Sequence, residues 1–382
     1  MSDLSRIAAA SLLLATVALG LMTAGAEAQR FIPDITISST VPPTPPTPPI
    51  PPGSGDLNPY GVAFVPRNFP ESNTIAPGDI LVSNFNNSDN IQGTGTTIVK
   101  LKPNVVTPSM QAPVFFTSTP IGLTTALGVL QRGFVVVGNL PNQPLPDGSL
   151  PPGSLQFINR HGTVVTTVPG SGLPGSPLDG PWDLTIDDDY SYPVIYVSNV
   201  LNGTVARLNL ALTSNSVTVT NKTVIASGYM FRTDPTAFVL GPTGLAHDRV
   251  TDILYVASTA DNAIFTIFNA STRNAPPSGK STGMMIASGG QLRGPLALAF
   301  APNGDLITSN GDAVKPDPTH PSEIVELTKT GEFVGQFNIS SAQGGAFGLA
   351  VAMVGFDTAR LAAVNDSTNE ILVIDQNVVL GE

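Results

Sequence analysis

The stretch TGLAHDRVTDILYVASTADNAIFTIF, residues 243–268, contains three short runs of small, β-branched and aromatic residues separated by polar turns. The same three runs return along the chain. Copies of the middle run are ILVSN (80–84), VVVGN (135–139), IYVSN (195–199), LYVAS (254–258), LITSN (306–310) and LAAVN (361–365). Six copies of one phrase indicate a repeat architecture, and a repeat decides the fold before any single element does.

A run that contains small residues precedes each copy of the middle run. Its copies are YGVAF (60–64), TALGV (125–129), WDLTI (182–186), TGLAH (243–247), LALAF (296–300) and FGLAV (347–351). A third run follows each copy, and most units add a fourth, such as APVFFTS (112–118). Four short β-rich runs bounded by Gly, Pro, Asn and Asp form an antiparallel blade. The sequence therefore predicts an all-β fold, a six-bladed β-propeller with four-stranded antiparallel blades.

Two segments could close the ring, because the sixth unit offers only the short run VVL (378–380) as its fourth strand. The alternative is a strand at residues 35–39, upstream of the proline run TVPPTPPTPPIPPG (40–53). Proline fixes φ and favours an extended polyproline II conformation, so this run would act as a stiff strap. We prefer closure by the N-terminal strand.

The first 28 residues predict export. Arg6 precedes an apolar run over residues 7–22, and the small-residue pattern Ala26-Glu27-Ala28 follows. This arrangement is typical of a signal peptide cleaved after Ala28, and the run is shorter than the roughly 20 residues that span a bilayer. We expect a periplasmic or extracellular protein without a membrane span in its mature chain. The expected parts are a signal peptide (1–28), an N-terminal strand and strap (29–57) and the propeller (58–382).

Composition excludes several classes of function. The chain has no cysteine, so neither a disulfide framework nor a cysteine nucleophile is available. Its net charge is −11 with only 17 Lys and Arg, which argues against nucleic acid as a partner, because phosphate binding needs a positive face. No G-x-S-x-G nucleophile elbow occurs, so the sequence shows no recognisable motif for hydrolysis through a covalent intermediate. We expect a monomer.

Two stretches carry a resemblance to a known family. GPTGLAHDRVTDILYVASTADNAIFTI (241–267) and VIYVSNVLNGTVARLNL (194–210) are similar to the NHL and YVTN groups of β-propeller repeats. The resemblance covers about residues 58–380 and implies exported recognition or scaffolding, with a glycan, peptide or protein as ligand. A related six-bladed group, similar to gluconolactonases and the senescence marker protein, is enzymatic. It holds one divalent metal through Glu, Asn and Asp placed just before the inner strands.

The metal set of that enzymatic group does not carry over to this sequence. The corresponding positions are Tyr60, Thr125, Trp182, Thr243, Leu296 and Phe347. None is Glu, Asn or Asp, whereas calcium requires several oxygen ligands with carboxylates among them. A hydrolase of this type would need a displaced ligand set, such as Asp183 with Asp56, Asn58 or Asp179. We expect no cofactor, with a divalent cation as the alternative, and we lean toward a binding function over an enzyme.

The aromatic residues at these positions predict a ligand site. Connections that enter inner strands and leave second strands open on one face, so Tyr60, Trp182 and Phe347 should surround one channel mouth. Aromatic rings supply apolar area at small entropy cost and suit a sugar or peptide. Alternatively, the rings plug the channel as packing. Three turns on this face are long, at residues 83–97, 139–154 and 310–323.

The recurring asparagines and one histidine have two interpretations each. Asn can close an Asx-turn and tolerates a left-handed backbone, or it could form a polar collar that binds a ligand. His247 occupies an inner-strand position that is normally apolar. It is interpreted either as a packed, hydrogen-bonded core residue or as a general base. The predicted ligand-binding set is Tyr60, Trp182, Asp183, Phe347, Asn84, Asn199, Asn310 and Asn365.

Overall fold

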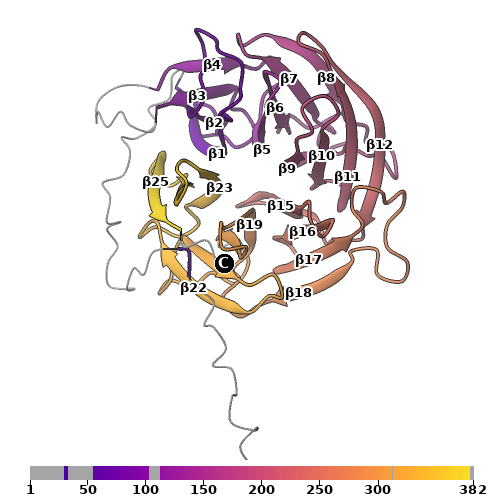
Figure 1. Cartoon of the computed structure of the whole chain (residues 1–382). Helices are drawn as coiled ribbons and strands as arrows, with labels where there is room; N and C mark the ends of the chain where they lie inside the picture. Colours follow the sequence, from indigo (N-terminus) through magenta and orange to yellow (C-terminus); the bar gives the residue numbers. More distant parts are fainter. Residues whose placement is uncertain (1–29, 33–54, 103–111, 312, 379–382) are drawn as a thin grey trace, which may run out of the picture.

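The computed structural model describes residues 30–32, 55–102, 112–311 and 313–378. Within these ranges the chain forms strands and no helix. Figure 1 shows the strands grouped into sheets that follow one another around a central axis, with the first and last sheets side by side. The predicted six-bladed β-propeller is confirmed.

The first three blades comprise strands β1 to β12. Their bounds are β1 (Leu57–Phe64), β2 (Ile80–Asn86), β3 (Thr97–Leu101), β4 (Val114–Thr117), β5 (Leu123–Leu130), β6 (Phe134–Asn139), β7 (Ser154–Asn159), β8 (Val164–Pro169), β9 (Pro181–Asp187), β10 (Val194–Asn199), β11 (Thr204–Leu212) and β12 (Val217–Ser227). A separate two-stranded hairpin follows, β13 (Arg232–Asp234) and β14 (Phe238–Leu240).

Blades 4 to 6 repeat the pattern. Their strands are β15 (Pro242–Asp248), β16 (Ile253–Ser258), β17 (Ala263–Phe268), β18 (Met284–Ser288), β19 (Pro295–Phe300), β20 (Leu306–Asn310), β21 (Glu323–Leu327), β22 (Phe333–Asn338), β23 (Ala346–Met353), β24 (Thr358–Asn365) and β25 (Glu370–Asn377). Blade 6 has three strands among the described residues. The predicted closing strand 35–39 lies outside the described residues, as do the predicted signal peptide and the proline run. Of the alternative closing run 378–380, only Val378 is described, and it is buried but not part of a strand.

The second strand of each blade is largely buried because neighbouring blades cover both its faces. Every residue of β2 and β6 is buried. The core lies between blades: Phe157 of blade 2 and Leu208 of blade 3, for example, belong to one apolar cluster. Face-to-face packing of sheets with right-handed twist places each inner strand at the centre of the ring.

A short N-terminal segment docks where blades 5 and 6 meet. Phe31 and Ile32 are buried in the apolar cluster of these blades. Their amides donate to the carboxylate of Glu326, at 2.9 Å from Phe31 N to Oε1 and 2.9 Å from Ile32 N to Oε2. Arg30 Nη2 donates to the carbonyl oxygen of Gln336 at 2.8 Å. The N-terminal segment is therefore held at Glu326 before the chain reaches the first blade.

The inner strands bend near the ends at which they begin. The register with the second strand shifts at Pro59/Val62, Leu123/Leu127, Ser198/Asn199, Pro242/Leu245, Pro295/Leu298 and Ala346/Leu349. A β-bulge redirects a side chain and increases local twist. The bulges coincide with the positions of Tyr60, Trp182 and Phe347, and they turn these residues toward the centre of the ring. No helix in the described part of the chain is long and apolar enough to cross a membrane.

Candidate functional site

A cavity of about 500 Å³ lies where the bulged ends of the inner strands converge. Residues from blades 1, 3, 4, 5 and 6 line this mouth cavity, together with the β13–β14 hairpin and two of the three long turns. The lining includes Tyr60, Trp182 and Phe347, so the three aromatic residues do meet at one mouth. Further lining residues are Gln92, Asp234, Val239, Thr243, Thr259, Leu296, Pro316, Gln343 and Asp366.

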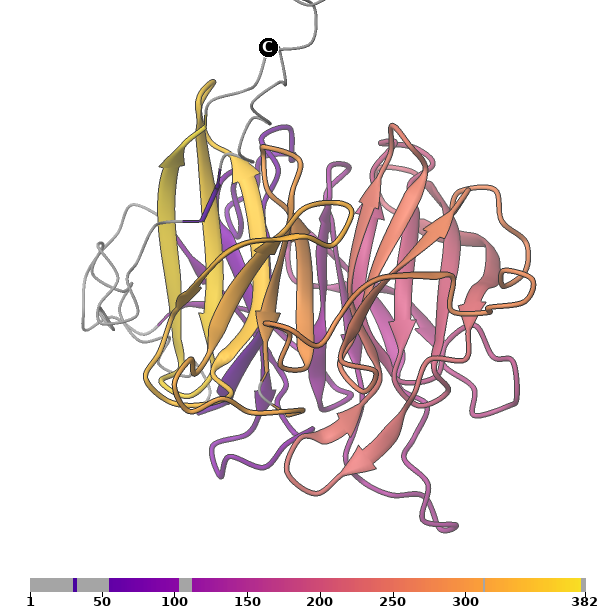
Figure 2. The same cartoon turned by 90° about the horizontal axis from the view of Figure 1, so that it is seen from below.

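The β13–β14 hairpin covers one side of the mouth cavity. Figure 2 shows it standing out from the lower face of the ring in that view. Gln92 from the first long turn donates its Nε2 hydrogen to the carbonyl oxygen of Thr236 at 3.1 Å, which joins blade 1 to the hairpin. Val239 packs in the apolar cluster that contains Trp182. The hairpin is thus both a wall of the cavity and a link between opposite sides of the mouth.

The aromatic residues form one packed group. Tyr60 lies between Phe85 and Phe347, with ring centroids 4.4 Å and 4.2 Å away. Trp182 meets Tyr60 and Phe85 edge-on, at 6.0 Å and 5.4 Å. Tyr60 and Trp182 are only 2% and 3% exposed, whereas Phe347 is half-buried. The rings therefore serve as packing and as cavity wall together, so the two predicted interpretations do not exclude one another.

One polar atom of this group has no partner. Trp182 Nε1 is buried and makes no hydrogen bond. Most buried donors are satisfied, and leaving one unmade costs about 1–3 kcal/mol. The hydroxyl of Thr243, which also lines the cavity, does have a partner, the carbonyl oxygen of Pro295 at 3.1 Å. Trp182 thus lines the cavity and keeps a buried indole donor without an acceptor.

Two carboxyl groups near the mouth are strongly affected by burial. Burial raises the pKa of Asp366 to about 8, against a weaker opposing effect of the Ser367 amide. Burial, and then the charge of Asp366, raise the pKa of Tyr60 well above its ordinary value. Burial also raises the pKa of Asp183, while the amide of Leu184 opposes the shift. Near neutral pH, Asp366 is therefore mostly a neutral acid.

The recurring asparagine at or near the end of five of the six second strands lies at the mouth end but is already bonded within the protein. Asn84, Asn199, Asn310 and Asn365 are at most 5% exposed. Asn199 accepts from the Asp179 amide, and Asn310 accepts from the Arg293 amide, so both reach the segment that enters the inner strand. None of the four has the left-handed backbone that the Asx interpretation allowed. The asparagine side chains therefore hold the segments around the mouth in place and are not part of the cavity lining.

The residues of the metal alternative have separate roles. Asp56 Oδ2 accepts four hydrogen bonds, from the amides and hydroxyls of Thr96 and Thr97. Burial raises the pKa of Asp179 to about 6. The amide of Asn58 donates to the side chain of Asn369 at 2.8 Å. In the described part of the chain, no three Asp, Glu or His side chains come together closely enough to hold a metal ion.

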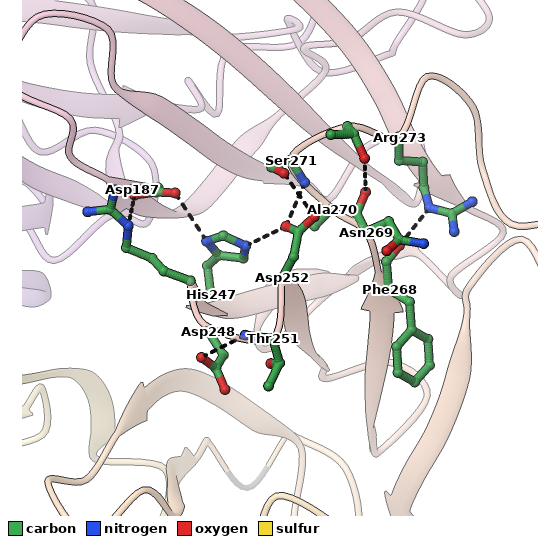
Figure 3. A network of polar contacts seen from close by, with 12 residues as sticks. Asp187, His247, Asp248, Thr251, Asp252, Phe268, Asn269, Ala270, Ser271 and Arg273 are labelled. Atoms are coloured by element: carbon green, nitrogen blue, oxygen red, sulfur yellow. Dashed lines mark hydrogen bonds and ion pairs between the residues drawn. The ribbon is translucent and has the colours of Figure 1, made fainter.

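His247 lies at the opposite end of the inner strands from the mouth (Figure 3). Its side chain is 3% exposed, with Nε2 3.1 Å from Asp252 Oδ1 and Nδ1 3.7 Å from Asp187 Oδ2. Arg249 Nε lies 2.6 Å from Asp187 Oδ1, and Ser271 donates to Asp252. Two carboxylates and a neighbouring tyrosine ring, Tyr196 at 4.7 Å, enclose the imidazole. His247 is a packed, hydrogen-bonded residue that joins blades 3 and 4.

Sequence reasoning missed two groups of mouth residues. Asp366 directly follows Asn365, and its position after a second strand was a usable signal. The hairpin residues Asp234 and Val239 belong to an insertion between blades 3 and 4, which the repeat pattern leaves without a counterpart. Insertions on a repeat scaffold are frequent carriers of function, so the added hairpin was the second signal.

Comparison with known proteins gives a likeness in fold. No family model matches the chain, and no curated protein matches its sequence. A gluconolactonase from Xanthomonas campestris superposes with a TM-score of 0.50 at 11% identity, over 85% of this chain and 88% of that one. The putative oxidoreductase (glucose dehydrogenase) of Thermus thermophilus gives 0.49 at 14%, over 85% and 97%. Regucalcin, a calcium-binding protein from Agrobacterium tumefaciens, gives 0.48 at 11%, over 87% and 96%.

This likeness establishes the fold alone. The chain is a six-bladed β-propeller, distantly similar in fold to the gluconolactonase from Xanthomonas campestris. Its kinship to NHL and YVTN repeats stays a prediction from the sequence.

Proposed function

We propose that the protein is an exported, non-enzymatic binding module that holds a small polar ligand with an apolar face, such as a sugar or a short peptide, in the mouth cavity. The observation that carries the proposal is the pairing of a cavity of about 500 Å³ with an aromatic wall that contains an unbonded indole donor. Ligand pockets are concave and mostly apolar, with a few placed polar groups, and they commonly enclose about 300–1,000 Å³.

The geometry suits binding because the wall is rigid before any ligand arrives. Tyr60 is clamped between two rings, and Trp182 is fixed by edge-on contacts. A ligand that accepts a hydrogen bond from Trp182 Nε1 would offset the cost of a buried, unsatisfied donor. Because neither ring needs to be ordered on binding, little conformational entropy is lost. The predicted signal peptide supports an exported location for this module.

The experiment uses the only tryptophan in the chain. Emission of Trp182 is recorded while monosaccharides, disaccharides and short peptides are titrated into the mature protein. We expect saturable changes with at least one ligand, since Trp182 lines the cavity. Isothermal calorimetry on the same ligands gives an independent dissociation constant.

A matched pair of variants locates the binding. Phe347→Ala removes a half-buried ring from the cavity wall, whereas Phe356→Ala removes a ring that is 90% exposed and lies outside the mouth. We expect at least tenfold weaker binding for Phe347→Ala and unchanged binding for Phe356→Ala. Tyr60 and Trp182 are poorer targets, because truncating fully packed rings costs about 3–5 kcal/mol of stability. Unchanged affinity in Phe347→Ala would remove the mouth cavity as the site.

A further inference from the structure

The lining of the mouth cavity is acidic. Among its described residues are two carboxylates, Asp234 and Asp366, and no lysine, arginine or histidine. The carboxylate of Asp234 is bonded to the amides of Ala237 and Thr236, which lower its pKa, and Arg232 Nη2 lies 3.8 Å away. Asp234 is thus ionised and partly neutralised at the rim of the cavity.

Asp366 lacks such a neutralising partner. No ion pair joins it to any of the described Lys, Arg or His side chains. Its main-chain amide is fixed by the carbonyl oxygen of Gly345 at 2.9 Å, so the carboxyl group is held at the cavity by its own backbone. A buried carboxylate without a cation is costly, and the group keeps its proton instead. That is the physical reason why the pKa of Asp366 is raised.

A second, independent feature of the same cavity indicates a ligand. Trp182 is 3% exposed, lines the cavity, and leaves Nε1 without a partner. Tyr60 interacts with both residues: its ring centroid is 6.0 Å from that of Trp182, and the charge of Asp366 contributes to the raised pKa of Tyr60. Two lining residues of the cavity therefore lack a partner among the described residues: Asp366 has no cation, and Trp182 Nε1 has no acceptor. Both residues interact with Tyr60.

We propose that the ligand of the mouth cavity carries a primary ammonium group that pairs with Asp366 and, next to it, an oxygen that accepts from Trp182 Nε1. An ammonium group gains the Coulomb attraction of the carboxylate and removes the cost of burying that charge alone. The net charge of −11 favours the approach of a cation to this face. An amino sugar and the amino end of a short peptide share this chemistry. The inference rests on the proposed function and specifies its ligand.

Two sets of matched probes test the inference in the unmodified mature protein. Glucosamine, glucose and glucuronate share a ring but differ in charge, and alanyl-alaninamide is matched by its N-acetyl derivative. Binding is followed by Trp182 emission and by calorimetry. We expect at least one amine to bind tenfold or more tightly than its neutral partner, and glucuronate to bind weakest of the sugars. The set that shows the preference identifies the source of the amine.

Variants then assign the preference to one residue. Asp366→Asn keeps the shape of the side chain, and we expect it to make amine and neutral probes bind equally. Asp357→Asn removes the same charge from an exposed position outside the mouth and should leave the preference unchanged. Equal binding of neutral and amine probes by the wild-type protein would overturn the inference while leaving the proposed function intact. Absence of binding by every probe in both assays would overturn both.

Discussion

Replacing Asp366 by Asn should change how stability depends on pH, even without a ligand. The folded-state pKa of about 8 exceeds the ordinary aspartate value near 3.9, so the folded protein holds a proton that the unfolded chain releases over that interval. Stability falls as pH rises wherever the folded state binds more protons. The wild-type protein therefore loses stability between about pH 4 and pH 8 on account of this group.

The size of the effect follows from the shift. About four units at 1.36 kcal/mol each set an upper limit of about 6 kcal/mol. Asp366 keeps some accessible surface in the cavity, and solvent reduces the penalty, so we expect about 3 kcal/mol. The Asn side chain does not titrate. The difference in free energy of unfolding between Asp366→Asn and wild type at pH 4 is taken as the reference. Relative to this value, the variant should gain about 3 kcal/mol by pH 8.

Urea unfolding of both proteins at intervals from pH 4 to pH 9 measures the difference. Contributions from other carboxyl groups with raised pKa values, such as Asp179 and Asp183, cancel because both proteins contain them. Asp357→Asn serves as the control and should show no pH-dependent gain. A constant difference between wild type and Asp366→Asn across this range would show that Asp366 is well solvated, and the reasoning about the mouth cavity would lose its main electrostatic support.

Two further predictions concern the scaffold. Glu326→Gln weakens two charge-assisted hydrogen bonds from the amides of Phe31 and Ile32, so hydrogen exchange at these amides should accelerate at least tenfold. Unchanged exchange would show that Glu326 does not hold the N-terminal segment in place. Gly244→Ala places a Cβ 2.4 Å from the backbone of β19 and should destabilise the fold by about 2–4 kcal/mol in thermal unfolding. The control Gly172→Ala has open space around it and should be nearly neutral. Equal effects of the two substitutions would refute the close approach of the two strands.

The ring was predictable because its determinants are local and repeated. Each second strand has a buried apolar stretch since two neighbouring blades cover it, and this produces a similar phrase six times. Small residues such as Gly61 and Gly244 follow from inner strands that nearly touch: a Cβ at Gly61 would lie 2.7 Å from the carbonyl oxygen of Thr125 in the next inner strand. Both signals depend only on the immediate surroundings of a strand, so they survive in a single sequence.

The serine of the SN phrase shows what the sequence could not reveal. Ser83 Oγ accepts from the amide of Gly61 at the bulge and donates to the carbonyl oxygen of Thr124 in the next blade. Ser309 does the same between Ala297 and Phe347. These bonds join segments tens of residues apart, and only the arrangement of the ring brings them together. In blades 1 and 5 this serine therefore fastens the bulge to the neighbouring blade.

The candidate site was predictable in part for the same reason. The aromatic positions follow from the repeat, so Tyr60, Trp182 and Phe347 could be assigned to one mouth. The hairpin lies outside the repeat. Asp366 follows the second strand of blade 6, but its burial depends on residues from other blades. No local pattern distinguishes Asp366 from a solvated turn aspartate, because the difference is made by residues from other blades.

Three features that lower stability lie around this mouth, and together they support a binding role. A carboxyl group is buried without a cation, an indole donor lacks an acceptor, and Phe238 in the covering hairpin has a φ of 65°, which is unfavourable for a bulky residue. Around them the inner strands are fastened by serine and threonine bonds to neighbouring blades. Local conflicts that the rest of a fold must compensate tend to lie at functional sites. A ligand with an ammonium group and an adjacent oxygen would relieve the first two of these conflicts in a single binding step, which is why we place the function of the propeller at this mouth.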